Sequence, residues 1–379
     1  MLTPVTFGGA ERVSLNFLKY VDRNKFNILP ILFIRPWEDE PYFVREIRKY
    51  GYTYLSVPVA LQESADPLRV FRAYAKVYSH LKRYSFDLVH THGYFADICA
   101  LPVARLLGFP TVSTCHGFIN NDTRLRLYNR LDLYALRMSY RVLCVSMEIR
   151  DLLIEHGIPS PRIRLVANAV EVSDNSERAK LLRNGARKMF SIGEGDMVLG
   201  FCGRLSPEKG ITSLLEAAAT LREAGFPIKV MIIGNGPERS IIERVTNSLG
   251  LKEKVIMAGF REDARELMAI FDVFVLPSLT EGTPMALLEA MSIGLPVVAS
   301  AVGEIPALIR LGENGILISP GRTDEIVYAI RSIMENPEFR DKLSTAALET
   351  IKSRFGLERW MHEMENYYFE AINNRCATR

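Results

Sequence analysis

The sequence has 379 residues, of which 48% are hydrophobic and 24% are charged, so it can form two soluble domains with separate cores. It contains no apolar run near the about 18 residues that a membrane-spanning helix needs, and its first six residues lack the features of a signal peptide. Its five cysteines are scattered singly, which excludes a disulfide framework or a zinc site as the organising feature. We expect a cytoplasmic protein, or one that lies peripherally on the inner face of the cell membrane.

The net charge of +3 is unevenly distributed. Residues 1–170 contain 22 Lys and Arg against 15 Asp and Glu, and five of the arginines lie within 123–141, interleaved with Leu and Tyr. This stretch could rest on an anionic membrane surface or bind an acidic acceptor. It could also be an amphipathic helix whose Arg stems cover the core while their charged ends stay in water, and we favour this interpretation. We expect no nucleic-acid partner.

Short β-rich runs alternate with helical patterns along the first half. The predicted strands are 28–34, 53–57, 87–92, 110–115, 141–146 and 163–166, and helical patterns include 10–21, 67–84, 97–107 and 147–156. Such alternation is typical of βαβ units with a parallel sheet.

After a polar, linker-like stretch at 171–177, the same pattern starts again. The predicted strands of the second half are 197–202, 228–233, 255–258, 271–276, 296–299 and 315–318. The sequence therefore predicts an α/β protein with two Rossmann-like, doubly wound domains. Ligands of such sheets bind at the carboxyl ends of the strands.

The stretch 277–291 follows the strand predicted at 271–276 and turns into a helix. Thr283 is the predicted N-cap, so the loop presents Glu281, Gly282 and the unpaired N–H of Met285 at a helix N-terminus, which is a ready anion site. Glu289, just over one turn into the helix, can direct a second carboxylate to the same place. An ordinary strand-to-helix junction with surface carboxylates is the alternative.

Glu281 and Glu289 fit the Glu-x7-Glu signature, and the stretch resembles the retaining glycosyltransferases of family 4 type, which have two facing Rossmann-like domains in the GT-B arrangement with an interdomain cleft. The resemblance implies transfer of a sugar from a nucleoside diphosphate. It also implies that Glu281 orients the sugar with the Met285 amide, and that Glu289 binds the ribose hydroxyls.

The segment 203–210 follows the first strand of the second domain. Arg204 and Lys209 flank a turn and can converge on one anion. They resemble the pair that holds the donor diphosphate in the family. No Asp-x-Asp triplet occurs, so we predict no metal and no other cofactor. The alternative is two solvated loop cations.

The first domain offers fewer signals. Gly8 and Gly9 precede a predicted helix, where paired glycines let backbone approach a phosphate or sugar, and they resemble the donor-contacting loop of the family. His116 ends a strand next to a glycine and resembles the histidine that contacts the donor sugar. His90 and His92 share one side of a strand, but no third metal ligand is evident, so we interpret them as packing or lining residues.

Two further loops resemble nucleotide-lining segments of the family. They contain Gly234 and the pair Phe260 and Arg261, whose backbone groups would read the base. Each is an ordinary turn signal when taken alone. Asn168 resembles the family's interdomain asparagine.

The resemblance also predicts the domain bounds. Residues 1–172 would form the acceptor-side domain, 173–358 the nucleotide-sugar domain, and 359–379 a helix that crosses back to the first domain. In the family a full buried strand precedes the glycine pair, whereas only six residues precede Phe7 here. We therefore expect that the natural start lies upstream or that a few residues are lacking.

The resemblance thus implies a metal-independent, retaining hexosyltransferase that uses a UDP- or GDP-sugar and a lipid-linked or saccharide acceptor, in cell-surface polysaccharide or glycolipid synthesis. Two alternatives remain: a nucleotide-sugar 2-epimerase, which shares this architecture, and a non-catalytic nucleotide-sugar-binding subunit. A dehydrogenase is disfavoured because the dinucleotide fingerprint at 234–236 is incomplete.

Overall fold

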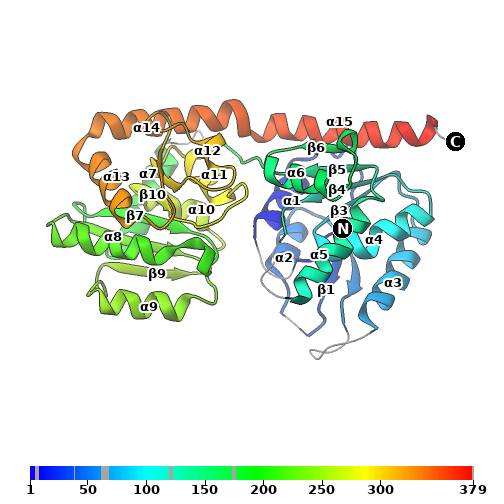
Figure 1. Ribbon diagram of the computed structural model, residues 1–379, viewed down its shortest axis with the longest axis horizontal. Coiled ribbons are helices and arrows are strands. Elements are labelled where there is room, and N and C mark those ends of the chain that lie inside the picture. The colour runs from blue at the N-terminus through cyan, green and yellow to red at the C-terminus, as the bar shows by residue number, and fades with distance from the viewer. Residues whose placement is uncertain (5–7, 38, 61–67, 119–122, 173–175, 378–379) are drawn as a thin grey trace. The chain divides into compact units, whose positions relative to one another are not determined.

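The chain folds into two α/β units in the computed structural model, which describes residues 1–4, 8–37, 39–60, 68–118, 123–172 and 176–377. Unit 1 comprises Met1–Asn168 together with Glu358–Arg379, and unit 2 comprises Ala169–Leu357. All strand pairs in both units are parallel, and helices pack against the sheets (Figure 1). The predicted α/β fold class, with two Rossmann-like doubly wound domains, is confirmed. Residues 173–175 of the predicted linker lie outside the described residues.

Unit 1 contains a parallel strand pair and a four-stranded parallel sheet. The pair is β1 (Ile31–Ile34) with β2 (Leu55–Pro58), and the sheet has the order β3 (Val89–His92), β4 (Thr111–Cys115), β5 (Arg141–Cys144), β6 (Ile163–Leu165). Leu2 lies between β1 and β3 and forms bridges with Leu32 and His92. Its N–H donates to Ile31 O at 3.2 Å, and its carbonyl accepts from Phe33 N at 3.0 Å. Leu2 thus occupies a central strand position between the two sheets.

Helices cover the sheets of unit 1. They are α1 (Gly9–Tyr20), α2 (Tyr42–Lys49), α3 (Arg69–Arg83), α4 (Tyr94–Leu106), α5 (Thr123–Leu136), α6 (Met147–Glu155), the short η1 (Ser160–Arg162) and the long α15 (Leu357–Ala377). The last helix is fixed to α1 by aromatic side chains: the Phe17 ring lies 6.1 Å from Trp360 and 5.5 Å from Tyr368, edge to face. Of the helices in the described part of the chain, none combines the length and the hydropathy needed to cross a bilayer.

Unit 2 contains one six-stranded sheet in the order β9-β8-β7-β10-β11-β12. Its strands are β7 (Met197–Cys202), β8 (Ile228–Ile233), β9 (Val255–Gly259), β10 (Val273–Leu276), β11 (Val297–Ser300) and β12 (Ile316–Ile318). Its helices are α7 (Ser176–Met189), α8 (Ile211–Glu223), α9 (Arg239–Ser248), α10 (Ala264–Leu267), α11 (Met285–Ser292), α12 (Ile305–Leu308), α13 (Thr323–Glu335) and α14 (Pro337–Thr350), with short turns η2 (Pro207–Lys209), η3 (Met268–Ile270) and η4 (Ile351–Phe355). The central strand β10 is fully buried and β7 is buried except at its two ends, which explains their continuous apolar sequences.

Each predicted strand is present, with bounds that differ by three residues at most. The largest difference is at β1, which starts at Ile31 because Pro30 has no N–H for the ladder. Similarly, β10 starts two residues late because Phe271 N donates to Met268 O at 3.0 Å and closes the preceding turn. The strand pattern therefore located the carboxyl ends of both sheets, where the predicted site residues lie.

Candidate active site

The strand order of unit 2 contains one reversal. Strands β7 and β10 are neighbours, but the chain continues from β7 towards β8 on one side and from β10 towards β11 on the other. Open parallel sheets bind ligands outside the carboxyl ends of the strands at such a switch point. The loops that follow these two strands are 203–210 and 277–284. The two most informative motifs of the sequence therefore meet at the position where this fold binds ligands.

Lys209 and Glu281 form the contact between the two loops. Lys209 Nζ donates to Glu281 Oε1 at 2.7 Å, and Ser278 Oγ donates to the same oxygen at 2.7 Å. The side chains of Lys209 and Glu281 are only 20% and 7% exposed, and Ser278 is fully buried. One ammonium group and one carboxylate are therefore held in fixed positions at the switch point. The sequence indicated both residues, but it indicated neither their ion pair nor Ser278.

Two glycines let the loops at this edge pack backbone against backbone. A Cβ on Gly234 would lie 1.8 Å from Gly203 O, and a Cβ on Gly303 would lie 1.9 Å from Glu281 O. Neither position can accept a side chain unless a loop moves. The sequence did not indicate Gly303, whose only signal is a glycine shortly after the predicted strand 296–299. Gly234 was interpreted as a nucleotide-lining residue, and its backbone supports the loop that carries Lys209.

Helix α11 presents its first turn at the same edge. The prediction that Thr283 is the N-cap is wrong: the helix begins at Met285, and Pro284 is the cap, with its carbonyl accepting from Leu287 N at 3.1 Å. The proline ring holds φ at −73° and leads the chain into the helix through extended backbone. The Met285 N–H still belongs to the first turn, whose amides have no acceptor within the helix.

Glu289 and Gly282 lie beside this first turn. Glu289 is in the second turn of α11 and is only 7% exposed. The Gly282 carbonyl accepts from Glu304 N at 3.4 Å, which joins the loop after β10 to the loop after β11. Glu289 and the Glu281 side chain are both buried, so neither is a surface carboxylate.

Arg204 lies in the same loop as Lys209, but it is exposed. Glu208 accepts a hydrogen bond of 2.6 Å from Ser206 Oγ. Burial opposes ionisation of Glu208, but this hydrogen bond and the charges of Lys209 and Arg204 lower its pKa. The loop thus carries one cation fixed to Glu281 and a second that extends into solvent. The predicted convergence of both cations on one anion requires Arg204 to turn inward when a ligand binds.

The loop after β9 contributes Phe260 and Arg261. Phe260 is 49% exposed. Arg261 forms a two-point ion pair with Asp263, with nitrogen–oxygen distances of 2.8 and 2.7 Å. Asp263 therefore occupies the guanidinium group, while the Phe260 ring is partly exposed.

Unit 1 gathers three histidines at the carboxyl ends of β3 and β4. His92 Nδ1 lies 3.3 Å from His116 Nε2, and the two rings stack with centroids 5.6 Å apart. His90 is hydrogen-bonded through one nitrogen to Thr114 Oγ1 at 2.8 Å and through the other to Tyr368 OH at 2.5 Å. The sequence indicated His116 as a site residue and His92 only as a packing or lining residue. The contact places the His92 ring directly against His116.

The three imidazoles are partly buried, and their desolvation opposes protonation. Burial lowers the pKa of His116 to about 4 and lowers the pKa values of His90 and His92 well below their usual range. Of the facing nitrogens of His92 and His116, one must donate the hydrogen bond and the other must accept it, so the tautomer of one ring depends on that of the other. Within the described residues, no group of three or more His, Cys, Asp and Glu side chains could hold a metal ion.

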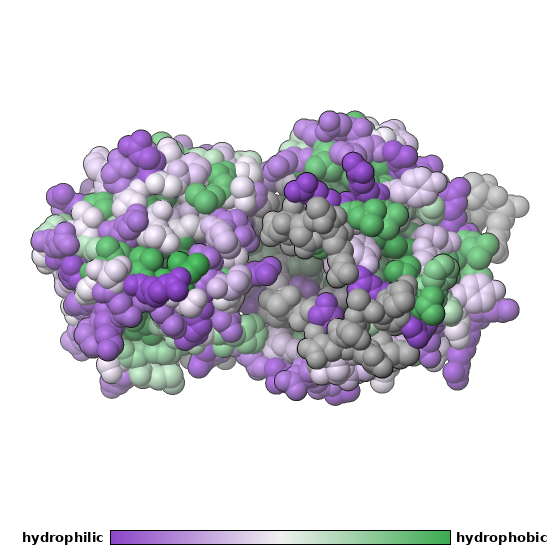
Figure 2. Space-filling model, turned by 60° about the horizontal axis from the view of Figure 1, so that its bottom comes forward, coloured by the Kyte–Doolittle hydropathy of each residue, from purple (hydrophilic) through white to green (hydrophobic). Residues whose placement is uncertain are grey.

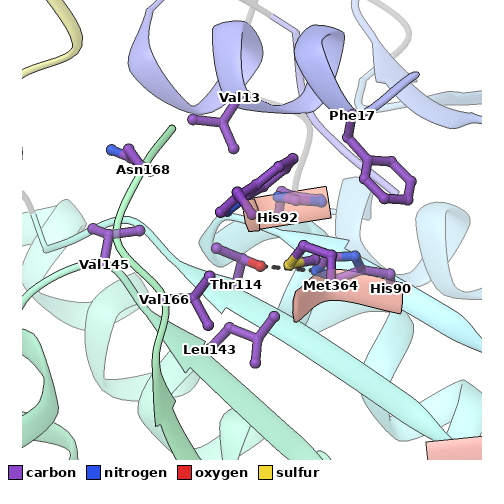
Figure 3. A pocket seen from close by; sticks show the side chains of 11 residues that line it. Val13, Phe17, His90, His92, Thr114, Leu143, Val145, Val166, Asn168 and Met364 are labelled. Carbon is purple, nitrogen blue, oxygen red and sulfur yellow. Dashed lines mark hydrogen bonds between the residues drawn. The ribbon is translucent and has the colours of Figure 1, made fainter. Parts of the chain in front are cut away.

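The histidines line a pocket inside unit 1 (Figure 3). Val13 and Phe17 point into it from α1, and Met364 lies on the α15 side. Its other lining residues are His90, His92, Thr114, Leu143, Val145, Val166, Asn168 and Trp360. The wall is therefore mainly apolar, with a few polar groups, which is the usual character of a pocket for an organic ligand. His92 belongs both to this pocket and to the contact with His116.

Gly8 and Gly9 form the start of α1. Gly8 is the N-cap, and its N–H donates to Glu11 Oε2 at 3.0 Å. Burial raises the pKa of Glu11 to about 7, although hydrogen bonds from the backbone amides of Glu11 and Gly8 act in the opposite direction. The Gly8 amide is thus already bonded, so a ligand at this loop would contact Gly9 or displace the Glu11 carboxylate.

The buried histidines lead to a pH prediction. We expect the free energy of unfolding to fall more steeply below pH 6.5 in the wild type than in a His116→Gln variant. The unfolded imidazole binds a proton near pH 6.5, whereas folded His116 does so only near pH 4, so acid favours the unfolded state between these values. Urea titrations at several pH values measure this slope. The exposed His362→Gln variant should keep the wild-type slope, and an equal slope for His116→Gln would contradict the burial effect.

Comparisons with known proteins agree with this geometry. The model of Glycosyltransferase Family 4 matches residues 7–174, and the model of Glycosyl transferases group 1 matches residues 183–350. The chain is similar to the Escherichia coli UDP-Gal:alpha-D-GlcNAc-diphosphoundecaprenol alpha-1,3-galactosyltransferase, with 26% identity over 97% of this chain and 95% of that protein. It is 25% identical to N-acetyl-alpha-D-glucosaminyl L-malate synthase of Bacillus anthracis over 77% of each chain.

A solved structure shares the fold over nearly the whole length. Anabaena Alr3699/HepE in complex with UDP-glucose superimposes with a TM-score of 0.80 at 21% identity, over 97% of this chain and 99% of that chain. The two family models together cover most of both units, and the relatives are glycosyltransferases. The chain therefore belongs to the glycosyltransferases of family 4 type.

Proposed function

We propose that the protein moves a sugar from a nucleoside-diphosphate sugar to a hydroxyl group of a lipid-linked or saccharide acceptor, with retention of configuration and without a metal ion. The observation that carries this proposal is the Lys209–Glu281 ion pair at the switch point between β7 and β10. It provides a cation for the diphosphate beside a carboxylate for sugar hydroxyls, at the usual ligand position of the fold.

The donor would lie along the carboxyl edge of unit 2. Lys209, Arg204 and the Met285 amide would stabilise the negative charge that develops on the departing diphosphate. Glu281 and the loop residues Gly282 and Thr283 would orient the sugar. Within unit 1, His116, with its tautomer set by His92, would contribute a neutral hydrogen-bonding group to the donor sugar, and Gly9 would contribute backbone contacts.

The proposed reaction exchanges one bond at the anomeric carbon. The bond from this carbon to the diphosphate oxygen breaks, and the acceptor oxygen forms a new bond to the same carbon from the same face. The acceptor hydroxyl passes its proton to the leaving diphosphate, so no covalent bond to the protein is needed. Neutral His116 fits this scheme because it can orient hydroxyl groups without adding a charge.

The relatives support the choice of donor and acceptor. The Escherichia coli relative is named for a UDP-galactose donor and a diphosphoundecaprenol acceptor, and it matches this chain almost from end to end. The Anabaena protein was solved with UDP-glucose. These names favour a UDP-sugar and a lipid-linked acceptor for this chain, with the reaction at a membrane surface in cell-surface polysaccharide or glycolipid synthesis.

Glu289 should control the binding of the donor rather than the chemical step. We expect Glu289→Ala to raise the KM for the donor about tenfold while kcat changes less than about twofold, because the buried carboxylate would bind ribose hydroxyls equally in the ground state and the transition state. Initial-rate kinetics over a range of donor concentrations measure this. Glu349→Ala, an exposed carboxylate of α14, is the control. An unchanged KM would remove Glu289 from the donor site.

The function itself is tested by a panel of UDP, GDP and ADP sugars. A bound donor raises the melting temperature in proportion to the logarithm of its concentration. The stabilising donor is then incubated with a lipid-diphosphate sugar acceptor, and the product anomer is identified by NMR. We expect one donor to stabilise the protein and to yield an α-linked product from an α-linked donor. Epimerised sugar in the absence of acceptor, or donor binding without any transfer, would contradict the proposal.

A further inference from the structure

Helix α5 carries an apolar stripe on the side that faces away from the core of unit 1. Leu127, Leu131 and Tyr134 are 59%, 46% and 62% exposed. Their spacing of four and three residues places them on one side of the helix, whereas Leu133 and Leu136 on the other side are buried. Arg126 and Arg130 of the same helix are exposed too, so its outer surface carries both charged and apolar side chains.

The stripe continues onto the first turns of two neighbouring helices. Leu68 and Phe71 at the start of α3 are 55% and 73% exposed, and Tyr94 at the start of α4 is 39% exposed. The ring of Tyr128 in α5 joins them, since its centroid lies 5.6 Å from the Tyr94 ring and 5.4 Å from the Arg69 guanidinium carbon. We call the surface formed by Leu68, Phe71, Tyr94, Leu127, Leu131 and Tyr134 the docking face.

Within helices α3, α4 and α5, the exposed charges near the docking face are basic. The only carboxylates within α3, α4 and α5 are Asp97 and Asp132, which are 1% and 4% exposed. The exposed charged side chains beside the apolar residues are basic, among them Arg72, Arg126 and Arg130. Unit 1, on the right of Figure 2, displays groups of hydrophobic side chains between hydrophilic ones. Exposed apolar residues beside the exposed arginines of these helices fit an anionic partner that also has an apolar layer.

We propose that the docking face binds an anionic membrane surface. The leucines and Phe71 would enter the boundary between head groups and acyl chains, and Arg126 and Arg130 would contact lipid phosphates. A second copy of the chain is a poorer partner, because two cationic surfaces repel each other.

The docking face also lies near the carboxyl edge of the sheet in unit 1. Tyr94 follows β3 by two residues, so it lies at the carboxyl edge of the sheet, where His92 and His116 meet. A membrane bound at this edge would present a lipid-linked acceptor to the side of unit 1 that carries the histidines. The inference deepens the proposed function by naming the partner surface, but membrane binding can be measured without donor or acceptor.

Sedimentation with lipid vesicles tests the docking face. We expect the full chain to bind vesicles that contain phosphatidylglycerol and phosphatidylcholine, and to bind phosphatidylcholine vesicles at least about tenfold more weakly. Leu127→Ser with Leu131→Ser should lower the bound fraction about tenfold at every salt concentration. Arg126→Gln with Arg130→Gln should lower it mainly at low salt, because salt screens the charge term.

The matched control changes equally exposed apolar residues of unit 2. Leu311 and Tyr328 are 66% and 76% exposed, so Leu311→Ser with Tyr328→Ser removes similar apolar area and should leave binding unchanged. Each variant should keep the donor-induced rise in melting temperature, which shows that it is folded.

Several results would overturn the proposal. They are absence of wild-type binding to anionic vesicles, equal loss in the Leu311 and Tyr328 control, and wild-type binding by the α5 variants. A concentration-dependent dimer that the α5 serines abolish would assign the face to a second copy. Vesicle binding in a protein that no sugar nucleotide stabilises would instead contradict only the proposed function.

Discussion

Lys209→Ala is expected to lower kcat about 100-fold or more, while the protein remains folded. Lys209 is the cation that the structure fixes at the switch point, through the 2.7 Å contact with Glu281. A positioned charge that stabilises the leaving diphosphate in the transition state is worth about 3 kcal/mol, which corresponds to about this factor. Its loss should appear in kcat more than in KM, because the charge on the diphosphate grows as the bond breaks.

Two variants make the Lys209 result specific. Lys209→Arg keeps the charge but changes its geometry, so we expect partial recovery of kcat relative to Lys209→Ala. Lys252→Ala removes an exposed lysine of the same unit and should behave as the wild type. Initial rates at saturating donor, together with urea unfolding curves, measure both effects. A Lys209→Ala enzyme with a near-normal kcat would show that the leaving group is not stabilised at this position.

Gly303→Ala is expected to destabilise unit 2 by about 3 kcal/mol and to lower activity more than tenfold. Gly303 has φ +54°, and its Cβ would lie 1.9 Å from Glu281 O. The left-handed conformation costs an alanine about 1 kcal/mol, and the steric overlap adds about 2 kcal/mol more. Relief of the overlap would displace Glu281 and thereby Lys209.

Gly312→Ala is the matched control for this prediction. Gly312 also has a positive φ, +73°, but no atom lies within 4 Å of its ideal Cβ position. The Gly312→Ala variant should therefore lose only about 1 kcal/mol of stability, the cost of the left-handed backbone for an alanine, and should keep its activity. Denaturant titration and initial rates compare the two variants. Equal stability and activity of both would mean that the approach of the loops after β10 and β11 does not hold Glu281 in place.

The sequence was sufficient to locate the edge at which the site lies. Runs such as 197–202 and 228–233 are apolar at all positions except Lys229, because strands β7 and β8 are largely buried on both faces, and this made their bounds predictable. The residues that directly follow such strands, including Lys209 and Glu281, could then be assigned to one edge, since the carboxyl ends of parallel strands coincide.

The contacts between loops could not be predicted. Ser278, which donates to Glu281, and Gly303, which accommodates its backbone, follow different strands and have no pattern in common. Their roles depend on the order of strands in the sheet, which the sequence of a single chain does not specify. The cap of α11 illustrates the same limit: Thr283 is the better cap by residue type, but the extended backbone of Pro284 decides where the helix begins.

The exposure of side chains on the helices also could not be predicted from the sequence. Leu127 and Leu131 share helical periodicity with the buried Asp132 and Leu136, so hydropathy alone would place the leucines inside and the aspartate outside. The structure reverses this for Asp132, whose carboxyl pKa is raised by burial and by the neighbouring Asp97. Which side of α5 faces the core depends on its packing against α4, a tertiary feature.

Hydrogen–deuterium exchange of the full chain, with and without the sugar nucleotide that stabilises it most, tests most directly whether the switch point of unit 2 is the donor site. We predict added protection in peptides that cover residues 203–210 and 277–289, with α9 unchanged. Exchange at unliganded rates in both of these segments, with protection confined to other parts of the chain, would contradict a donor site built around Lys209 and Glu281.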